Sequence, residues 1–288
     1  MRLAGVDIGG TAIKIGVVDT GAGLISRFSH PTPVGDPKAV TDLIAREVSA
    51  LDVAALGVGS AGSVRLDTGL IYSGNLGWWG IPLRKMLATR LNLPIWVDND
   101  AQAALMAEVF QGELQGAKNA VYLTIGTGIG GALLLSGQPW RGSRNTAAEL
   151  GHMITHGDGL PCACTRRGCF EMYASCSALS RMAGGLQAPE IFRRARENDS
   201  RMLEVLQSYY HEIGIGIVSL ISIFNPEVIV LGGGISAAGE TLLRGVQEDV
   251  RRQLAKRGDY SCGRIVFAKH GNDAGIIGAA MLARHYLL

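Results

Sequence analysis

The sequence of 288 residues lacks a long apolar run and a secretory signal. Its longest apolar stretch, 213–224, is interrupted by two serines and is shorter than the ~18 residues that a membrane-spanning helix needs. Asp7 lies where a signal peptide would carry its apolar core. We therefore expect a cytoplasmic protein.

The sequence also lacks a block of charge of one sign. Its formal net charge is +2, from 27 basic and 25 acidic residues spread along the chain. Such a surface offers no strong field for a phosphate backbone or an anionic membrane, so we expect neither as a partner. With 47% hydrophobic and 18% charged residues, the chain is expected to fold, as one large domain or two moderate ones.

Glycine, by contrast, is abundant, with 40 residues, about twice its usual share of ~7%. There is no collagen period, so we expect many separate tight turns between buried elements. Short apolar runs predict strands at 3–6, 13–18, 54–58, 95–97, 120–125, 132–135, 228–231 and 265–268. Helices are predicted at 38–51, 83–91, 101–110, 202–224, 241–254 and 274–286. Strands alternating with helices indicate an α/β protein.

Three predicted strands end in glycine-rich loops, at 7–11, 124–131 and 231–236. Glycines let backbone N–H groups approach an oxyanion, so the three loops together favour a phosphate-binding site over ordinary turns. The candidate residues are Asp7, Gly9, Gly10, Thr11, Thr127, Gly128, Gly233 and Gly234. Asp7 could hold Mg²⁺, and the third loop is expected to head a helix. Neither the dinucleotide fingerprint nor a P-loop fits these spacings.

Two of these loops lead directly into a second strand, which suggests two similar lobes facing a cleft. We expect a small N-terminal lobe at 1–118 and a large lobe at 119–273. The last helix, 274–288, is expected to complete the first lobe.

Three polar residues, Asp98, Asn99 and Asp100, follow the predicted strand at 95–97. Helix capping explains one such residue, but not three. A carboxylate at this sheet edge could accept the proton of a hydroxyl that attacks a phosphoryl group. We assign Asp100 as this base and Asn99 as an orienting partner.

A loop at 75–79 carries an amide and two indoles. Tryptophan in a loop is more often a lid or core anchor than a ligand contact. Asn75 and Gly62 could approach a polyol from the same lobe.

A histidine and three cysteines lie within eighteen residues, in the spacing H-x9-C-x-C-x4-C. His152, Cys162, Cys164 and Cys169 form a soft four-ligand set that suits structural Zn²⁺. His156 is a competing ligand. The alternative is three free buried thiols beside an unrelated histidine.

Two carboxylates flank this candidate metal site. A rigid metal loop would hold Glu149 and Glu171 in fixed relation, as acceptors for sugar hydroxyls. His152 could offer its second ring nitrogen to the same ligand.

These motifs together resemble those of the ROK sugar kinases (repressors, open reading frames, kinases) of the actin-like ATPase superfamily. The resemblance rests on 7–11, 99–101, 126–131, 149–171, 231–234 and 272–275, and so covers nearly the whole chain. It implies two lobes of the ribonuclease H-like fold closing on sugar and ATP, often in a homodimer. It also implies that Asp100 is the base on the sugar 6-hydroxyl, that Asn99, Glu149, His152 and Glu171 bind sugar, and that His152 and the three cysteines bind zinc.

The chain departs from the family pattern at two places. Thr165 stands where the family usually has glycine in the zinc segment, and Ala12 stands where lysine usually follows the first loop. The nearest lysine is Lys14, which we include among the nucleotide-binding candidates.

The expected reaction is transfer of the γ-phosphoryl group of ATP·Mg²⁺ to the 6-hydroxyl of an aldohexose. Glucose is the first candidate and N-acetylmannosamine the second, while a β-glucoside or allose stays open. The rivals are a transcriptional regulator and a non-catalytic sugar sensor. The first would need a DNA-reading module before Asp7, and the second would not need Asp100.

Overall fold

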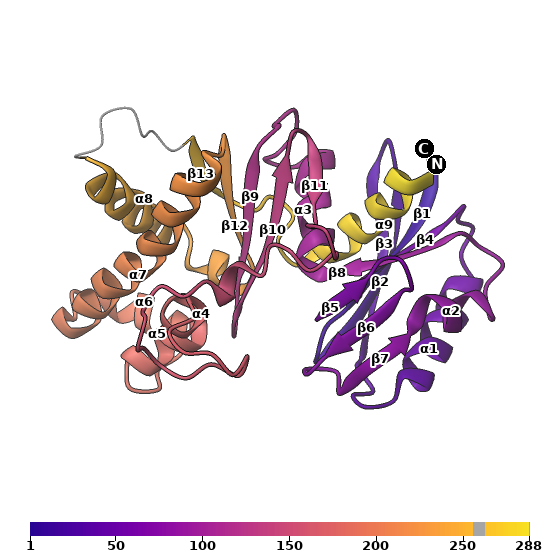
Figure 1. The fold of residues 1–288 in the computed structure, drawn as a ribbon, viewed down its shortest axis with the longest axis horizontal. Helices are drawn as coiled ribbons and strands as arrows, with labels where there is room; N and C mark the ends of the chain where they lie inside the picture. The colour runs from indigo at the N-terminus through magenta and orange to yellow at the C-terminus, as the bar shows by residue number, and fades with distance from the viewer. Residues whose placement is uncertain (256–262, 288) are drawn as a thin grey trace. The chain divides into compact units, whose positions relative to one another are not determined.

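The computed structural model describes residues 1–255 and 263–287, so Cys262, for which the sequence suggested only ordinary burial, lies outside the described residues. The chain divides into two compact units (Figure 1). One comprises Met1–Gly116, Pro139–Ala147 and Asn272–Leu288, and the other comprises Ala117–Gln138 and Ala148–Gly271. Each unit contains a five-stranded sheet with helices packed against it.

The sheet of the first unit has the strand order β3-β2-β1-β4-β8. Its strands are β1 (Arg2–Ile8), β2 (Ala12–Asp19), β3 (Gly23–Pro31), β4 (Leu56–Ser60) and β8 (Ile95–Asn99). The first three form an antiparallel meander, while β1, β4 and β8 run parallel. The helices of this unit are α1 (Pro37–Ser49), α2 (Leu83–Ala88), α3 (Asp100–Gln111) and α9 (Ala274–Leu287).

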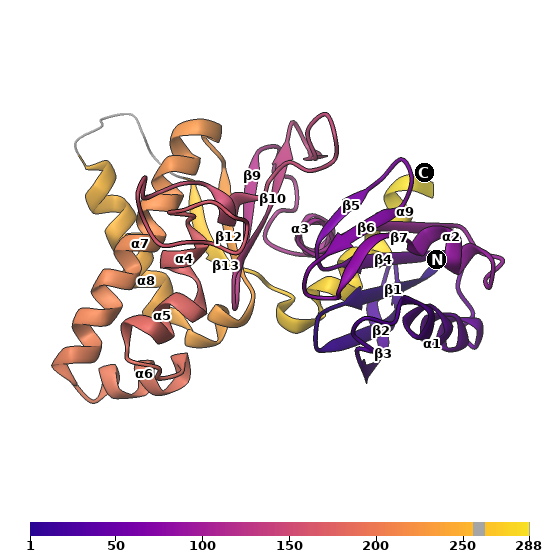
Figure 2. The same cartoon turned by 60° about the horizontal axis from the view of Figure 1, so that its bottom comes forward.

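The C-terminal helix α9 packs directly on this sheet, beside α3 (Figure 2). Glycines on β1 and β4 make the close approach possible. A Cβ added to Gly57 would lie 1.7 Å from the carbonyl oxygen of Ala279, and one added to Gly5 would lie 2.0 Å from that of Ile276. Segments from the two ends of the chain therefore share one core.

A small sheet of three antiparallel strands, in the order β5-β6-β7, completes the first unit. These strands are β5 (Ser63–Arg65), β6 (Leu70–Ser73) and β7 (Trp78–Pro82). The loop between β6 and β7 carries Asn75. Trp78 is buried, whereas Trp79 is largely exposed, so only the first indole anchors the core.

The second unit repeats the arrangement of the first sheet, with the order β11-β10-β9-β12-β13. The strands of this sheet are β9 (Ala120–Ile125), β10 (Ile129–Leu135), β11 (Gln138–Trp140), β12 (Val228–Gly232) and β13 (Arg264–Phe267), and the division between the units falls within β11, after Gln138. β9 and β10 form a hairpin, while β9, β12 and β13 run parallel. The helices are α4 (Glu171–Ala174), α5 (Cys176–Met182), α6 (Ala188–Arg196), α7 (Ser200–Phe224) and α8 (Glu240–Leu254).

Each strand and helix predicted from the sequence is present, with ends that move by a few residues. The prediction missed β3, the small sheet, β11 and the short helices α4 to α6. Two local predictions were wrong. Trp78 and Trp79 begin strand β7 instead of lying in a loop, and the third glycine loop leads into a five-residue 3-10 turn, Gly234–Ala238, before α8 begins at Glu240. Within 1–255 and 263–287, no helix combines the length and apolar character needed to cross a bilayer.

Candidate functional site

The candidate residues of the first unit gather at the carboxyl ends of β1, β4 and β8. Asp7 pairs in register with Gly59, and Gly59 pairs with Asp98, so these residues form one row across the parallel strands. The next row pairs Ser60 with Asn99. This sheet edge is where α/β proteins bind ligands.

Asn99 is the N-cap of α3 and is held at both ends of its amide. Its Oδ1 accepts the backbone N–H groups of Ala101 at 2.9 Å and Gln102 at 3.2 Å. Its Nδ2 donates to the carbonyl oxygen of Gly62 at 2.9 Å. The capping role weighed from the sequence therefore falls to Asn99, and the same contacts give its side chain one orientation.

Asp100 is the first residue of α3 and lies at the same sheet edge. Its Oδ1 accepts the backbone N–H of Ala101 at 2.8 Å. A Cβ added to Gly59 of β4 would lie 3.7 Å from the Cα of Asp100, so the two backbones are close. The half-buried Asp100 carboxyl group thus belongs to a well-defined helix end.

Gly62 lies in the bend between β4 and β5, and Asn75 lies in the loop between β6 and β7. Gly62 has a φ of 101°, and an added Cβ would lie 2.4 Å from the carbonyl oxygen of Tyr72, so only glycine fits there. Asn75 is exposed. A Cβ added to Gly10 of the first loop would lie 3.7 Å from the Cβ of Asn75. The structure thus brings Gly62 to Asn99, and Asn75 to the first loop.

The first loop joins β1 to β2 as a tight turn. The N–H of Gly9 donates to the carbonyl oxygen of Ala12 at 3.0 Å, while Gly10 and Thr11 are exposed. Asp7 faces Lys14 across the two strands, with Oδ2 3.5 Å from Nζ. Burial raises the pKa of Asp7, and the Lys14 ammonium offsets only part of that rise. Lys14 therefore reaches the first loop from the second strand.

The other two glycine loops lie side by side in the second unit, after β9 and β12. A Cβ added to Gly233, whose φ is 83°, would lie 2.6 Å from the carbonyl oxygen of Ile125. The loop at 126–128 is held by Cys176, whose N–H donates to the carbonyl oxygen of Gly126 at 2.8 Å. Thr127 and Gly234 are both exposed. The backbone of Cys176 thus helps to hold the loop at 126–128, a role that the sequence had not suggested.

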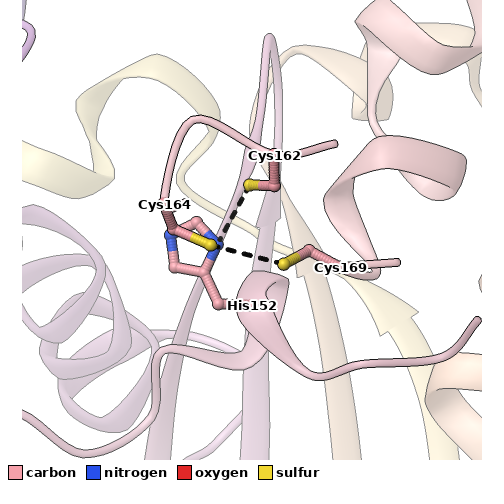
Figure 3. Close-up of side chains that lie close together, drawn as sticks. All are labelled: His152, Cys162, Cys164 and Cys169. Carbon is pink, nitrogen blue, oxygen red and sulfur yellow. Dashed lines mark hydrogen bonds between the residues drawn. The ribbon is translucent and has the colours of Figure 1, made fainter. Parts of the chain in front are cut away.

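The four predicted metal ligands converge in the second unit (Figure 3). The ligand atoms of His152 and the three cysteines all lie within 4.8 Å of one another. Cys164 Sγ lies 3.4 Å from Cys169 Sγ, and Cys162 Sγ lies 3.8 Å from His152 Nδ1. Tetrahedral zinc with sulfur ligands at about 2.3 Å would separate them by about 3.7 Å, so the set fits that ion.

The thiols of this cluster differ in how readily they ionise. Burial raises the pKa of the Cys162 thiol to about 12. Burial opposes ionisation of Cys164 as well, but hydrogen bonds from Arg166 outweigh it and lower the pKa of that thiol to about 6. Without a bound cation, three neighbouring thiols do not all ionise.

Glu171 touches both the metal cluster and the second glycine loop. Its Oε1 lies 3.1 Å from Cys162 Sγ and 3.4 Å from His152 Nδ1. Its Oε2 lies 3.4 Å from the backbone nitrogen of Ile129, just after Gly128. By contrast, Glu149 is exposed, three residues before His152.

His156, the competing ligand in the sequence, lies elsewhere. Its ring stacks on Tyr173 with centroids 3.9 Å apart, and its Nε2 lies 3.6 Å from Glu212 Oε2 on α7. The structure therefore brings His152, and not His156, to the thiols.

Sequence reasoning missed two features beside the candidate site. Asp98 forms a buried ion pair with Arg141, whose position 43 residues away gave no local signal. Thr165 has a φ of 70°, in the left-handed region that favours glycine. The sequence did hint at this left-handed backbone, because Thr165 stands where the family pattern has glycine.

Comparisons with known proteins identify the chain's relatives. The model of the ROK family matches residues 3–286. This chain belongs to the ROK family. A glucokinase of Halalkalibacterium halodurans is 34% identical, over 97% of this chain and 94% of that protein. An N-acetyl-D-glucosamine kinase of Escherichia coli O1:K1 is 30% identical, over 96% of this chain and 98% of that protein.

A solved structure supports the same assignment. The ROK family glucokinase of Streptomyces griseus, crystallised with glucose and AMPPNP, is 33% identical, with a TM-score of 0.87 over 99% of this chain and 100% of that one. The predicted actin-like ATPase fold is confirmed, and this ROK protein is a sugar kinase.

Proposed function

We propose that this kinase transfers the γ-phosphoryl group of ATP to the 6-hydroxyl of an aldohexose, with Asp100 as the general base. The observation that carries the proposal is the sheet edge where Asn99 caps α3, holds Gly62 and leads directly into Asp100. A base must be held within hydrogen-bond reach of the proton that it accepts. A carboxylate at a rigid helix start meets that need.

Residues of each unit are proposed as sugar contacts. In the first, Gly62, Asn75 and Asn99 are the proposed partners of its hydroxyl groups. In the second, Glu149, Glu171 and the Nε2 atom of His152 are proposed, because His152 Nδ1 faces Cys162. The proposed division is a small lobe at 1–118, completed by 274–288, and a large lobe at 119–273.

The phosphates of ATP would be held by backbone N–H groups and hydroxyls of the glycine loops. The first loop offers Gly10 and Thr11 beside Lys14, and Gly9, whose N–H is engaged by Ala12, would let the phosphates approach the backbone closely. The other loops offer Thr127, Gly128, Gly233 and Gly234. Asp7 would hold Mg²⁺ directly or through water, and the ion would neutralise charge on the transferred group.

We propose zinc as the resident ion of the cluster at His152, Cys162, Cys164 and Cys169. Zinc in a closed four-ligand site supplies structural cross-linking and no open position for water. Through Glu171, the same residues would set the position of the loop at 126–128.

Glucose is the proposed acceptor, and N-acetylmannosamine is the second candidate. The segment at 75–79 resembles the corresponding segment of bacterial glucokinases, and two relatives named above are glucokinases. The E. coli relative adds N-acetylglucosamine to the sugars that must be compared. The residues Glu149, His152 and Glu171 suit a pyranose with a free or N-acetylated C2.

Asp100→Asn tests the base. It keeps the shape of the side chain but removes the proton acceptor, so kcat should fall by about 10² or more. Hexose affinity, measured by calorimetry, should change little. Near-normal turnover in a coupled ADP-release assay would contradict the assigned role.

A panel of hexoses tests the acceptor. Glucose should give the highest kcat/KM among glucose, N-acetylmannosamine, N-acetylglucosamine, allose and a β-glucoside. The control is 6-deoxyglucose, which lacks the proposed acceptor oxygen and should bind without being phosphorylated. A protein that binds sugar but releases no ADP with any acceptor would instead be a sugar sensor.

A further inference from the structure

A buried ion pair joins Arg141 to Asp98, the residue before Asn99. Arg141 donates to Asp98 Oδ2 through Nη2 at 2.6 Å and through Nε at 2.9 Å. Only 10% of the Arg141 side chain and 6% of the Asp98 side chain are exposed. Neither residue belongs to the proposed binding or catalytic set, so the pair needs an explanation of its own.

Stability alone explains this pair poorly. Two charges lose their hydration when they are buried, and well-packed apolar side chains at such positions often stabilise a protein as much. A guanidinium group, however, directs its N–H groups in fixed directions and so holds a carboxylate in one place. The pair is therefore better suited to specifying a position.

The second carboxylate oxygen of Asp98 connects the ion pair to Asn99. Asp98 Oδ1 accepts the backbone N–H of Asn99 at 2.8 Å, so both carboxylate oxygens are engaged. Asn99 in turn caps α3 and holds the carbonyl group of Gly62, and the next residue is Asp100. A displacement of the Asp98 side chain would thus be passed on to the start of α3.

Arg141 is itself anchored within the first unit. Its Nη1 donates to the carbonyl oxygen of Pro139 at 3.2 Å, and its Cζ lies 6.0 Å from the ring centroid of Tyr286. Tyr286 stacks on Trp96 of β8, the strand that ends in Asp98. The segment at 139–147 belongs to the first unit, although the chain on either side of it belongs to the second.

We infer that Arg141 is a positioning residue for phosphoryl transfer, acting through Asp98 on Asn99 and Asp100. This inference rests on the proposed function. Without the guanidinium group, Asp98 is a buried carboxylate that has lost its cation, and such a group takes up a proton or turns toward water. Either change releases the N–H of Asn99, and a displacement of about 1 Å in a reacting group costs about 10²-fold in rate.

Arg141→Gln tests this role in the full-length enzyme. We expect kcat to fall by about 10²-fold, as for a misplaced base. The KM for the hexose should rise, because Asn99 moves, whereas the KM for ATP should stay unchanged. If Arg141 were needed only for folding, the substitution would lower the amount of folded enzyme, and the folded fraction would keep the wild-type kcat and hexose KM.

Two further variants sharpen the test. Arg141→Lys keeps the charge but loses the planar fork, so we expect an intermediate loss of kcat of about 10-fold. Arg144→Gln removes an exposed arginine from the same segment and should behave as the wild type. Circular dichroism at the assay temperature identifies the folded variants, and Arg141→Lys carries the test if Arg141→Gln does not fold.

The inference would be overturned if folded Arg141→Gln enzyme had the wild-type kcat and hexose KM. If Arg141→Gln does not fold, the same result in Arg141→Lys would overturn it. Asp100→Asn separates this failure from a failure of the proposed function. If Asp100→Asn is inactive while the folded Arg141 variant is normal, only the positioning role is refuted. If Asp100→Asn turns over normally, the proposed base itself is refuted.

Discussion

Asp7 carries its charge at a position where burial makes that charge unfavourable. Burial raises its pKa, which means that the folded protein holds the carboxyl proton more tightly than the unfolded chain does. An acid of this kind destabilises the fold increasingly as pH rises above its unfolded pKa of about 3.9. Such a cost is typical of a residue kept for ligand binding, here the proposed Mg²⁺ contact.

Asp7→Asn should therefore stabilise the protein while it impairs the kinase. We expect its melting temperature to exceed that of the wild type at pH 7, by about 2–4 °C for each kcal/mol gained. This difference should shrink as pH falls toward the unfolded pKa of Asp7, because the wild type then takes up a proton at the same place. Thermal melts at several pH values, together with kcat/KM at varied Mg²⁺, make the measurement.

Asp19→Asn is the matched control on the same sheet. Backbone N–H groups of Gly21 and Ala22 lower the pKa of Asp19, so its charge stabilises the fold above its unfolded pKa. Its removal should lower the melting temperature at pH 7, with a smaller effect in acid. A melting difference for Asp7→Asn that does not vary with pH would contradict the burial argument.

At the scale of elements, the metal loop at 152–169 shows a local conflict between residue and backbone. Thr165 has a φ of 70°, which a β-branched residue adopts at a cost of about 1–2 kcal/mol. Gly168 has a φ of 73°, and there an added Cβ would lie 1.5 Å from the carbonyl oxygen of His156. Both positions have a backbone conformation that favours glycine, but only position 168 is a glycine.

Thr165→Gly should stabilise this loop by about 1 kcal/mol, because relief of the strained φ exceeds the added entropy of the unfolded chain. We expect a higher melting temperature and slower loss of zinc to a chelator, followed with a colorimetric zinc indicator. Gly168→Ala, the control, should lose zinc faster than the wild type. Faster zinc loss from Thr165→Gly than from the wild type would show that the threonine side chain helps the loop.

At the same scale, the sequence was most informative where apolar runs were long and bounded by glycine. The strands β1, β9 and β12 and the helix α7 were predicted for this reason. The small sheet at 63–82 was missed because its strands have only three to five residues, which is too short for a periodic pattern to stand out. The helix expected at the third glycine loop begins later, because Gly239 with its φ of 68° starts α8 anew after the 3-10 turn.

At the scale of the whole molecule, the two units have sheets of the same strand order, each with glycine loops at the strand ends. We expect that hexose binding excludes water from the phosphoryl group.

This expectation predicts that ATP is hydrolysed very slowly when no hexose is present. ADP release without hexose should be at least about 10²-fold slower than with glucose, because water is not held in line for attack. A coupled assay measures both rates. Equal rates of ADP release with and without glucose would contradict the expected exclusion of water.

The sequence by itself determined the local chemistry of this protein. The spacing from His152 to Cys169 predicted a metal-binding loop, and the three glycine loops predicted phosphate contacts, because such requirements act over a few residues. Sequence also placed Asp100 after a buried strand, where α/β proteins bind ligands. These features depend on residues that are close together in the sequence, so a short segment is enough to show them.

Only the tertiary structure decided which residues meet. It brought Arg141 to Asp98, Lys14 to Asp7 and Glu171 to the loop after β9. These contacts join segments that strand pairing and helix packing place together, and no local pattern encodes a partner 43 residues away. Burial then gives each contact its strength, because a charge removed from water depends on the partner that the fold supplies.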